Sequence, residues 1–133
     1  MKKMLTIMLA VVLMLAVSGC GVEPQHKVSY VSGEKLTVLE QYDCVAVYTQ
    51  YTNDSSETAV PADEVTVKAF QNGVELSPLV PTGDRTNGYV QCDSNVQSGT
   101  TADVVWLFEL DDDSTVSVEL SGGEKVEIPL TEE

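Results

Sequence analysis

Few side chains in this chain of 133 residues suit covalent or acid–base chemistry. The sequence has three cysteines, Cys20, Cys44 and Cys92, and a single histidine, His26. Acidic residues number 21, against 7 lysines and arginines. The cysteines could be modified, paired or bound to a metal, whereas the histidine and the carboxylates could transfer protons. Their positions along the chain decide between these roles.

Cys20 ends an N-terminal apolar run that starts at Met4 and follows two lysines. Such a run is typical of a secretory signal peptide. It is too short for a membrane-spanning helix, which needs about 20 apolar residues. An ordinary signal peptide, cut near Gly19, is one interpretation.

The residues Val17-Ser18-Gly19-Cys20 resemble the lipobox of bacterial lipoproteins. The resemblance implies that residues 1–19 are a cleaved lipoprotein signal peptide. Cys20 would then carry a diacylglycerol and palmitate, and would hold the protein on the extracellular face of the cell membrane by lipid alone.

Cys44 and Cys92 remain in the mature chain. An isolated cysteine pair in an oxidising compartment favours a disulfide. The chain lacks the CxxC spacing and the ligand histidines of a structural zinc site, so metal binding by this pair is disfavoured. We therefore predict a Cys44–Cys92 disulfide.

His26 lies in residues 20–34, which mix Pro, Gly, Ser, Lys and Glu and are predicted to be a lipidated cysteine and a tether. A short first strand near residues 28–31 is an alternative within this segment. A tether offers no fixed partners to a histidine, so His26 is predicted to be solvated. Without a positioned histidine, Ser-His-Asp and Cys-His catalysis are both disfavoured.

Asp111, Asp112 and Asp113 form the one acidic run that suggests a metal, because Ca²⁺ prefers several carboxylate and carbonyl oxygens. The run lacks the spaced DxDxDG arrangement of a calcium loop, so a solvated turn is the preferred interpretation. Weak Ca²⁺ binding stays open. We expect no other metal and no cofactor.

The mature chain is strongly acidic. Removal of residues 1–19 leaves five basic and 21 acidic residues, a net charge of −16. Such a chain has no basic stripe for phosphates, so nucleic acid is not an expected partner. Anionic lipid headgroups would also repel it.

Alternation of apolar and polar residues predicts β-strands from residue 35 onward. Residues 43–52 alternate between two faces, and Asn72-Gly73 between β-prone residues predicts a tight hairpin. The seven or eight predicted short strands, with frequent turn signals, indicate an all-β, immunoglobulin-like antiparallel sandwich spanning residues 35–133. We expect a monomer.

Residues 101–110 are the most apolar part of the mature chain. Read as a strand of period two, they place Val104, Trp106 and Phe108 on the inner face. Val105 and Leu107 lie on the other face, which is too apolar to be wholly solvated. The tyrosines could form a glycan or peptide platform, with one or two of them exposed on residues 43–52.

Three segments together resemble a known family: Tyr51-Thr52-Asn53, residues 69–76 and Leu110-Asp111-Asp112. The family comprises Gram-positive surface lipoproteins with a single immunoglobulin-like domain of unknown function, similar in fold to the secreted mycobacterial immunoprotective antigen. The resemblance implies a lipid-anchored extracellular β-sandwich. It implies no catalytic or binding residues.

Two functional hypotheses follow. The preferred one is a non-catalytic module that binds a protein, a peptide or an envelope polymer at the cell surface. The alternative is a small secreted hydrolase that uses surface carboxylates, which would require two acids in one deep pocket.

Overall fold

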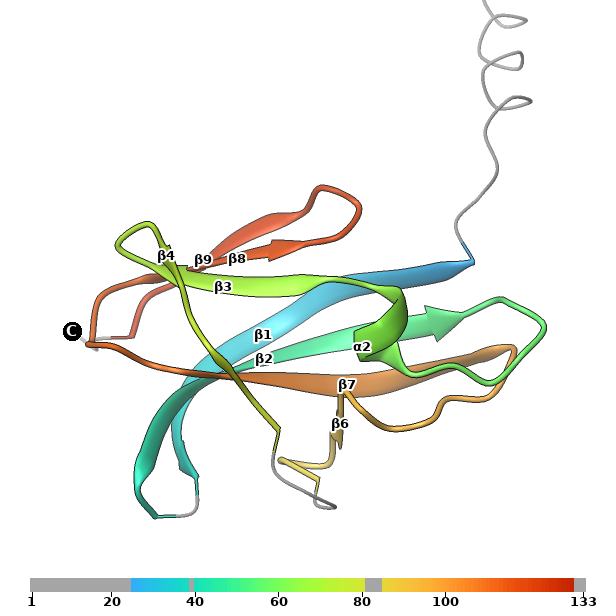
Figure 1. Ribbon diagram of the computed structural model, residues 1–133, viewed down its shortest axis with the longest axis horizontal. Coiled ribbons are helices and arrows are strands. Elements are labelled where there is room, and N and C mark those ends of the chain that lie inside the picture. The colour runs from blue at the N-terminus through green and yellow to red at the C-terminus, as the bar shows by residue number, and fades with distance from the viewer. Residues whose placement is uncertain (1–24, 39, 81–84, 131–133) are drawn as a thin grey trace, which may run out of the picture.

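Two β-sheets pack face to face in a computed structural model of the chain, which describes residues 25–38, 40–80 and 85–130 (Figure 1). The first sheet has the order β1-β2-β7-β5, with β6 also paired to β7, and the second has the order β4-β3-β8-β9. All pairs are antiparallel except β6 with β7. The predicted all-β sandwich is confirmed, whereas the signal peptide and Cys20 lie outside the described residues. The elements are β1 (His26–Val38), β2 (Tyr42–Asn53), α2 (Pro61–Glu64), β3 (Val67–Gln71), β4 (Val74–Glu75), β5 (Pro78–Leu79), β6 (Val90–Gln91), β7 (Thr100–Glu109), β8 (Val116–Leu120) and β9 (Lys125–Ile128).

The core between the sheets follows the alternation of β2 and β7. Val104, Trp106 and Phe108 are buried in the cluster that fills the space between the sheets, as predicted. The indole Nε1 of Trp106 donates to Thr49 Oγ1 at 3.0 Å, and Thr49 Oγ1 donates to the carbonyl of Val104 at 2.8 Å. The one polar atom of the large aromatic residue is thereby satisfied inside the core.

The outer face of the first sheet carries a second apolar cluster. Cys44, Ala46, Tyr48, Val105 and Leu107 are buried there. Partly buried Leu36, Leu79 and Tyr89 pack against them. The prediction that this side of the 101–110 strand is partly covered is therefore confirmed.

Strand β1 begins at His26, well before residue 35, where the sequence analysis starts the domain, and just before the short strand near residues 28–31 that it kept as an alternative. It pairs with β2 from His26↔Asn53 to Val38↔Tyr42, with a register shift between Tyr30 and Ser32. Residues 26–34, predicted to be a tether, thus belong to the sheet. The domain does not start at residue 35, because the alternation of His26, Val28 and Tyr30 with Lys27 and Ser29 already satisfies the pattern of a half-buried strand.

The Asn-Gly hairpin is confirmed. Asn72 has φ 53° and Gly73 has φ 82°, so both central residues adopt the left-handed conformation that a type I′ turn requires. The turn joins β3 to the short edge strand β4.

Buried Gln71, at the end of β3, organises the neighbouring loop 111–114. Its Oε1 accepts from the amides of Asp111 at 2.8 Å and Asp112 at 3.3 Å. Its Nε2 donates to the carbonyls of Asp112 at 3.0 Å and Ser114 at 2.8 Å. One side chain therefore makes hydrogen bonds to four backbone groups of this loop.

Asn53, the last residue of β2, organises the turn after that strand in the same way. It is fully buried. Its Nδ2 donates to the carbonyls of Glu57 and Val96, each at 2.9 Å, and its Oδ1 accepts from the amide of Ser55 at 3.0 Å and from the Ser55 hydroxyl at 2.6 Å. Two of the segments that carry the family resemblance thus contain buried residues that shape turns.

The predicted Cys44–Cys92 disulfide is absent, and both residues are free thiols. Cys44 faces the outer cluster with Ala46, whereas Cys92 lies in the cluster between the sheets. The side chains therefore lie on opposite faces of the first sheet, a geometry that a disulfide cannot bridge without moving the backbone.

Both thiols are expected to be unreactive in the folded protein. Burial, and then nearby carboxylates, raise the pKa of Cys44 and the pKa of Cys92 to about 11 each. At pH 8 only about one thiol in a thousand is then ionised, and the thiolate is the nucleophile. Mass spectrometry after iodoacetamide treatment should show neither residue labelled in the native protein and both labelled in urea. Labelling of either one in the native protein would contradict this.

The same residues predict a loss of stability at alkaline pH. Between about pH 9 and pH 11 the unfolded thiols lose protons that the folded thiols retain, so the free energy of unfolding falls as the pH rises. Urea titrations at pH 8, 9.5 and 10.5 should show a falling midpoint. The Cys44→Ala variant should lose part of this pH dependence, and an equal dependence in the variant would show that this thiol is not responsible.

Candidate binding groove

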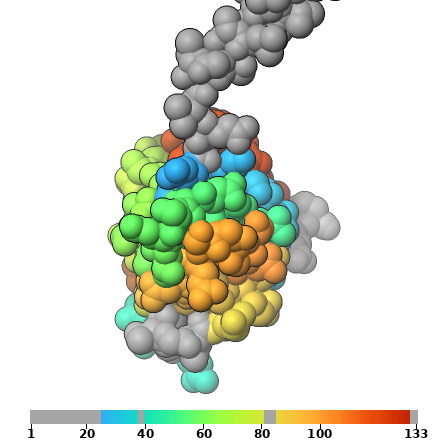
Figure 2. Space-filling view, turned by 90° about the vertical axis from the view of Figure 1, so that its right-hand side faces the viewer, coloured from blue at the N-terminus to red at the C-terminus, as the bar shows by residue number. Residues whose placement is uncertain are grey.

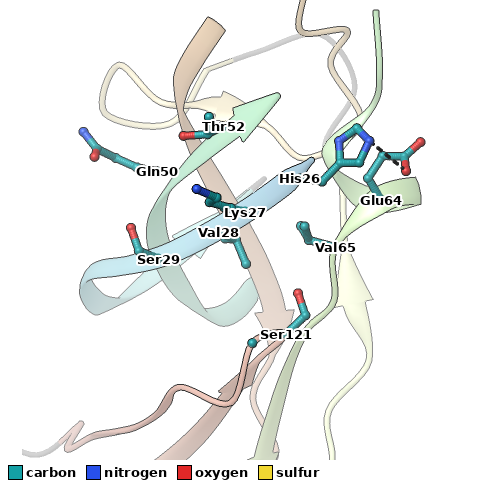
Figure 3. A pocket seen from close by; sticks show the side chains of 10 residues that line it. His26, Lys27, Val28, Ser29, Gln50, Thr52, Glu64, Val65 and Ser121 are labelled. Atoms are coloured by element: carbon teal, nitrogen blue, oxygen red, sulfur yellow. Dashed lines mark ion pairs between the residues drawn. The ribbon is translucent and has the colours of Figure 1, made fainter. Parts of the chain in front are cut away.

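A groove of about 510 Å³ runs along the start of β1, at the end of the sandwich where that strand begins (Figure 3). Figure 2 looks onto this end, which is formed by the start of β1, the segment after β2 and the segment before β7. One wall comes from β1 and β2, and the other from α2, the residue after it and the β8–β9 turn. The lining residues are His26, Lys27, Val28, Ser29, Gln50, Thr52, Glu64, Val65, Ser121 and Gly122.

His26 is positioned by the fold at one end of this groove. Its Nδ1 lies 2.6 Å from the hydroxyl oxygen of Tyr51, and its Nε2 lies 3.3 Å from Glu64 Oε1. Figure 3 shows the imidazole directed toward Glu64. The prediction that His26 is solvated is wrong, because β1 starts at this residue and carries its side chain between β2 and α2.

Both ring nitrogens of His26 have a partner. Burial, and then the charge of Glu64, raise the pKa of Tyr51, so the phenol keeps its proton beside the ring. Because both ring nitrogens are engaged, the arrangement ties β1, β2 and α2 together, and it leaves no ring nitrogen directed at a substrate.

Replacement of His26 should therefore lower stability. His26→Ala leaves the hydroxyl of the buried Tyr51 without its hydrogen-bond partner, which should cost about 1–3 kcal/mol. Tyr51→Phe in the same background should restore part of the loss, because it removes the orphaned hydroxyl. Urea unfolding followed by circular dichroism measures both. Additive costs in the double variant would contradict the proposed contact.

Within the described residues, no strand pairs with the edge of β1 that borders the groove. In the described sheets β1 pairs with β2 alone. The carbonyl of Gln25 accepts from the amide of Asp54, on the β2 side, at 2.7 Å, whereas the amide of Tyr30 donates to Glu124 Oε1, on the other side, at 3.2 Å. Since backbone groups alternate along a strand, those of His26, Val28 and Tyr30 point away from β2.

The open edge ends soon after Tyr30. The register of β1 shifts between Tyr30 and Ser32. A Cβ on Gly33 would collide with Ile128 Cδ1, so β9 approaches the strand closely there. The accessible edge thus spans residues 26–30.

A second hollow of about 330 Å³ opens on the apolar core and includes Cys92, Trp106 and Phe108 in its lining. It holds Glu75 as its only carboxylate and Lys68 as its only cation. The groove beside β1 also contains one carboxylate, Glu64. Neither hollow therefore contains the acid pair that the hydrolase hypothesis requires.

The aspartate run lies in a turn, as preferred in the sequence analysis. Asp112 Oδ1 accepts from the amide of Ser114 at 2.9 Å and Oδ2 accepts from Asn72 at 3.1 Å, while Asp113 pairs with Lys35 at 2.7 Å. Hydrogen bonds from the hydroxyl of Ser114 and then from its amide hold the pKa of Asp112 below its ordinary value. Within the described residues no three His, Cys, Asp or Glu side chains are placed to hold a metal ion.

The expected tyrosine platform on β2 is not formed. Tyr48 and Tyr51 are both buried, with exposed fractions of 5% and 0%. Tyr48 packs on Tyr89 with ring centroids 4.6 Å apart, and its hydroxyl donates to Glu34 Oε2 at 2.6 Å. Tyr48 and Tyr51, the tyrosines of residues 43–52, therefore fill the structure and are not available as a glycan surface.

Comparison with known proteins agrees with the fold. Residues 21–122 match the family model of the domain of unknown function DUF5067. The chain belongs to this family. A solved structure of a "putative lipoprotein from Staphylococcus aureus subsp. aureus NCTC 8325" matches with a TM-score of 0.61 and 10% identity, over 81% of this chain and 86% of that one. At this identity the likeness shows the fold alone.

No curated protein matches the sequence. Across residues 25–38, 40–80 and 85–130, no helix is both long enough and apolar enough to cross a membrane.

Proposed function

We propose that this DUF5067 protein is a non-catalytic binding module, held on the extracellular face of the cell membrane by a lipid on Cys20. The observation that supports binding is the groove beside β1, which is open, lined by hydroxyl, amide and charged side chains, and bordered by an unpaired strand edge. Concave sites with a few convergent polar groups are where ligands bind. A similarity in fold to the secreted mycobacterial immunoprotective antigen is also part of this proposal, and it rests on the sequence resemblance.

The engaged state of His26 supports binding over catalysis. A general base needs a lone pair directed at the substrate, and both nitrogens of this ring already have partners. The groove lining contains one carboxylate, Glu64, and therefore no acid pair. The partner is a protein, a peptide or an envelope polymer, and the acidic chain favours a neutral or basic one.

The anchor is tested by Cys20→Ser in the host. The variant should stay unprocessed or leave the membrane fraction, because one acylated residue carries all of the proposed attachment. Cell fractionation and the mass of the mature protein give the result. Cys44→Ser, which keeps Cys20, is the control, and mature protein that stays on the membrane in the Cys20→Ser variant would refute the anchor.

Binding through the groove is tested by photo-crosslinking on host cells. Ser29, exposed in the groove, and Glu119, exposed on β8, are each replaced by p-benzoylphenylalanine. A defined adduct should form from position 29 and not from position 119. Adducts of equal yield from both positions would refute the groove as the site.

Catalysis is tested separately. The purified protein is screened on glycan, ester and peptide substrates. Turnover that disappears with a single carboxylate substitution, while the circular dichroism spectrum stays unchanged, would favour the hydrolase hypothesis instead.

A further inference from the structure

We propose that the groove binds its partner by strand addition: an extended, cationic peptide segment pairs with residues 26–30 of β1. This inference rests on the proposed binding function and names the ligand class of the same site. It is carried by three observations: the direction of the free backbone groups, the side chains on either side of them, and the sign of the charges at the two ends.

The backbone groups on the outer edge of β1 are placed to pair with a further strand. His26, Val28 and Tyr30 direct their amides and carbonyls away from β2, and His26 and Val28 line the groove. The Tyr30 amide donates a hydrogen bond to a carboxylate oxygen, Glu124 Oε1. The carbonyl of an added strand can take that position, which would release Glu124. An exposed edge of this kind is a template for a further strand.

The inner side of the edge is apolar in the middle. Val28 has an exposed fraction of only 9%, and it lines the groove together with Val65. A residue of the ligand that lies opposite Val28 therefore directs its side chain at these two valines, and a β-branched apolar residue suits that position.

The ends of the same edge are acidic. Glu64 contacts His26 at one end, and Glu124 contacts Tyr30 at the other. Since His26 and Tyr30 are four residues apart on the strand, two lysines four residues apart in an extended ligand lie at the matching positions. The negative net charge of the chain also favours a positively charged ligand.

These requirements define a probe. In Ac-Thr-Lys-Thr-Val-Thr-Lys-Thr-NH2 the valine lies opposite Val28, the two lysines lie opposite His26 and Tyr30, and the threonines face away from the core. Binding of the fluorescein-labelled probe to the membrane-purified, full mature protein in detergent micelles is measured by fluorescence anisotropy. Saturable binding is expected, and the peptide with both lysines replaced by glutamate should not bind.

Two changes test the backbone pairing. N-methylation of the probe valine removes its donor to Val28 and should weaken binding at least about fivefold. In the protein, Val28→Pro removes an outward amide, and Glu75→Pro removes an outward amide from edge strand β4 as the matched control. Only Val28→Pro should abolish binding. Because that variant risks unfolding, hydrogen exchange of the unmodified protein is the second measurement, and the probe should slow exchange of the Val28 amide but not that of Glu75.

Two further variants test the charges. Glu124→Lys and Glu119→Lys change the net charge equally, but of the two only Glu124 contacts the open edge of β1. Glu124→Lys should weaken the probe about three- to fivefold more than Glu119→Lys does. Equal effects would show that binding depends on overall charge, and would refute the site.

The remaining outcomes separate this inference from the proposed function. If the N-methylated probe binds as well as the parent, strand addition is wrong. If no probe binds while the position-29 adduct still forms on cells, the cationic ligand class is wrong and the binding function stands. If neither occurs, both are wrong.

Discussion

Trp106→Ala is expected to destabilise the domain by about 3–5 kcal/mol, because it removes the largest side chain that spans the two sheets. A domain of this size has only about 5–15 kcal/mol of stability, so much of the variant should be unfolded near the physiological temperature. The loss includes the bond to Thr49, whose hydroxyl would lose its donor. Urea unfolding followed by circular dichroism measures the change.

Trp106→Phe is the matched control. It keeps an aromatic ring between the sheets and deletes only the indole Nε1 bond and part of the volume, so a cost of about 1–2 kcal/mol is expected. If the alanine variant costs no more than the phenylalanine variant, Trp106 does not bridge the sheets as described.

Gln71→Glu is expected to have a similarly large effect, with a strong dependence on pH. The change replaces the Nε2 that donates to the carbonyls of Asp112 and Ser114 with an oxygen, and it buries a group that can ionise. Burial and the two carbonyls would raise the pKa of the new carboxyl in the folded state. A cost of about 3–5 kcal/mol at neutral pH is expected, because the buried charge keeps two amide donors at one oxygen but faces two carbonyls at the other.

The pH dependence has a definite sign. Above the ordinary glutamate pKa the unfolded chain releases a proton that the folded chain retains, so the variant loses stability relative to the parent as the pH rises from about 4 to 7. Urea midpoints at pH 4 and pH 7 test this. Gln97→Glu, at an exposed position, should show almost no difference between the two pH values. A pH-independent cost for Gln71→Glu would refute the buried-charge explanation.

The sequence predicted the parts of this fold that depend on local pattern. The two faces of β2 and β7 follow from period-two alternation, and the Asn72-Gly73 turn follows from its need for two left-handed residues. The outward direction of Cys44 could also have been found from the sequence. The same alternation that places Val45 in the core places Cys44 on the opposite face.

The candidate site was missed because its residues come from separate parts of the chain. His26 looked solvated in a segment rich in polar residues, and nothing in the sequence pairs it with Tyr51 or Glu64. Alternation of His26, Val28 and Tyr30 was the one available signal, and it was weak because a histidine stands at an inward position. That the edge of β1 is open depends on the strand order, which a period-two pattern does not determine.

The early start of β1 also determines how the domain is presented. In the lipid-anchored form that we propose, residues 21–25 would separate the lipid from the first strand, and five residues span at most about 18 Å when fully extended. The groove is at this end of β1, whereas the Asn72-Gly73 turn lies toward the far end of the sandwich (Figure 1). The groove would then open within a few tens of ångströms of the bilayer. A partner embedded in the same membrane would meet it at a high effective concentration, whereas a bulky soluble partner would be obstructed by the lipid surface.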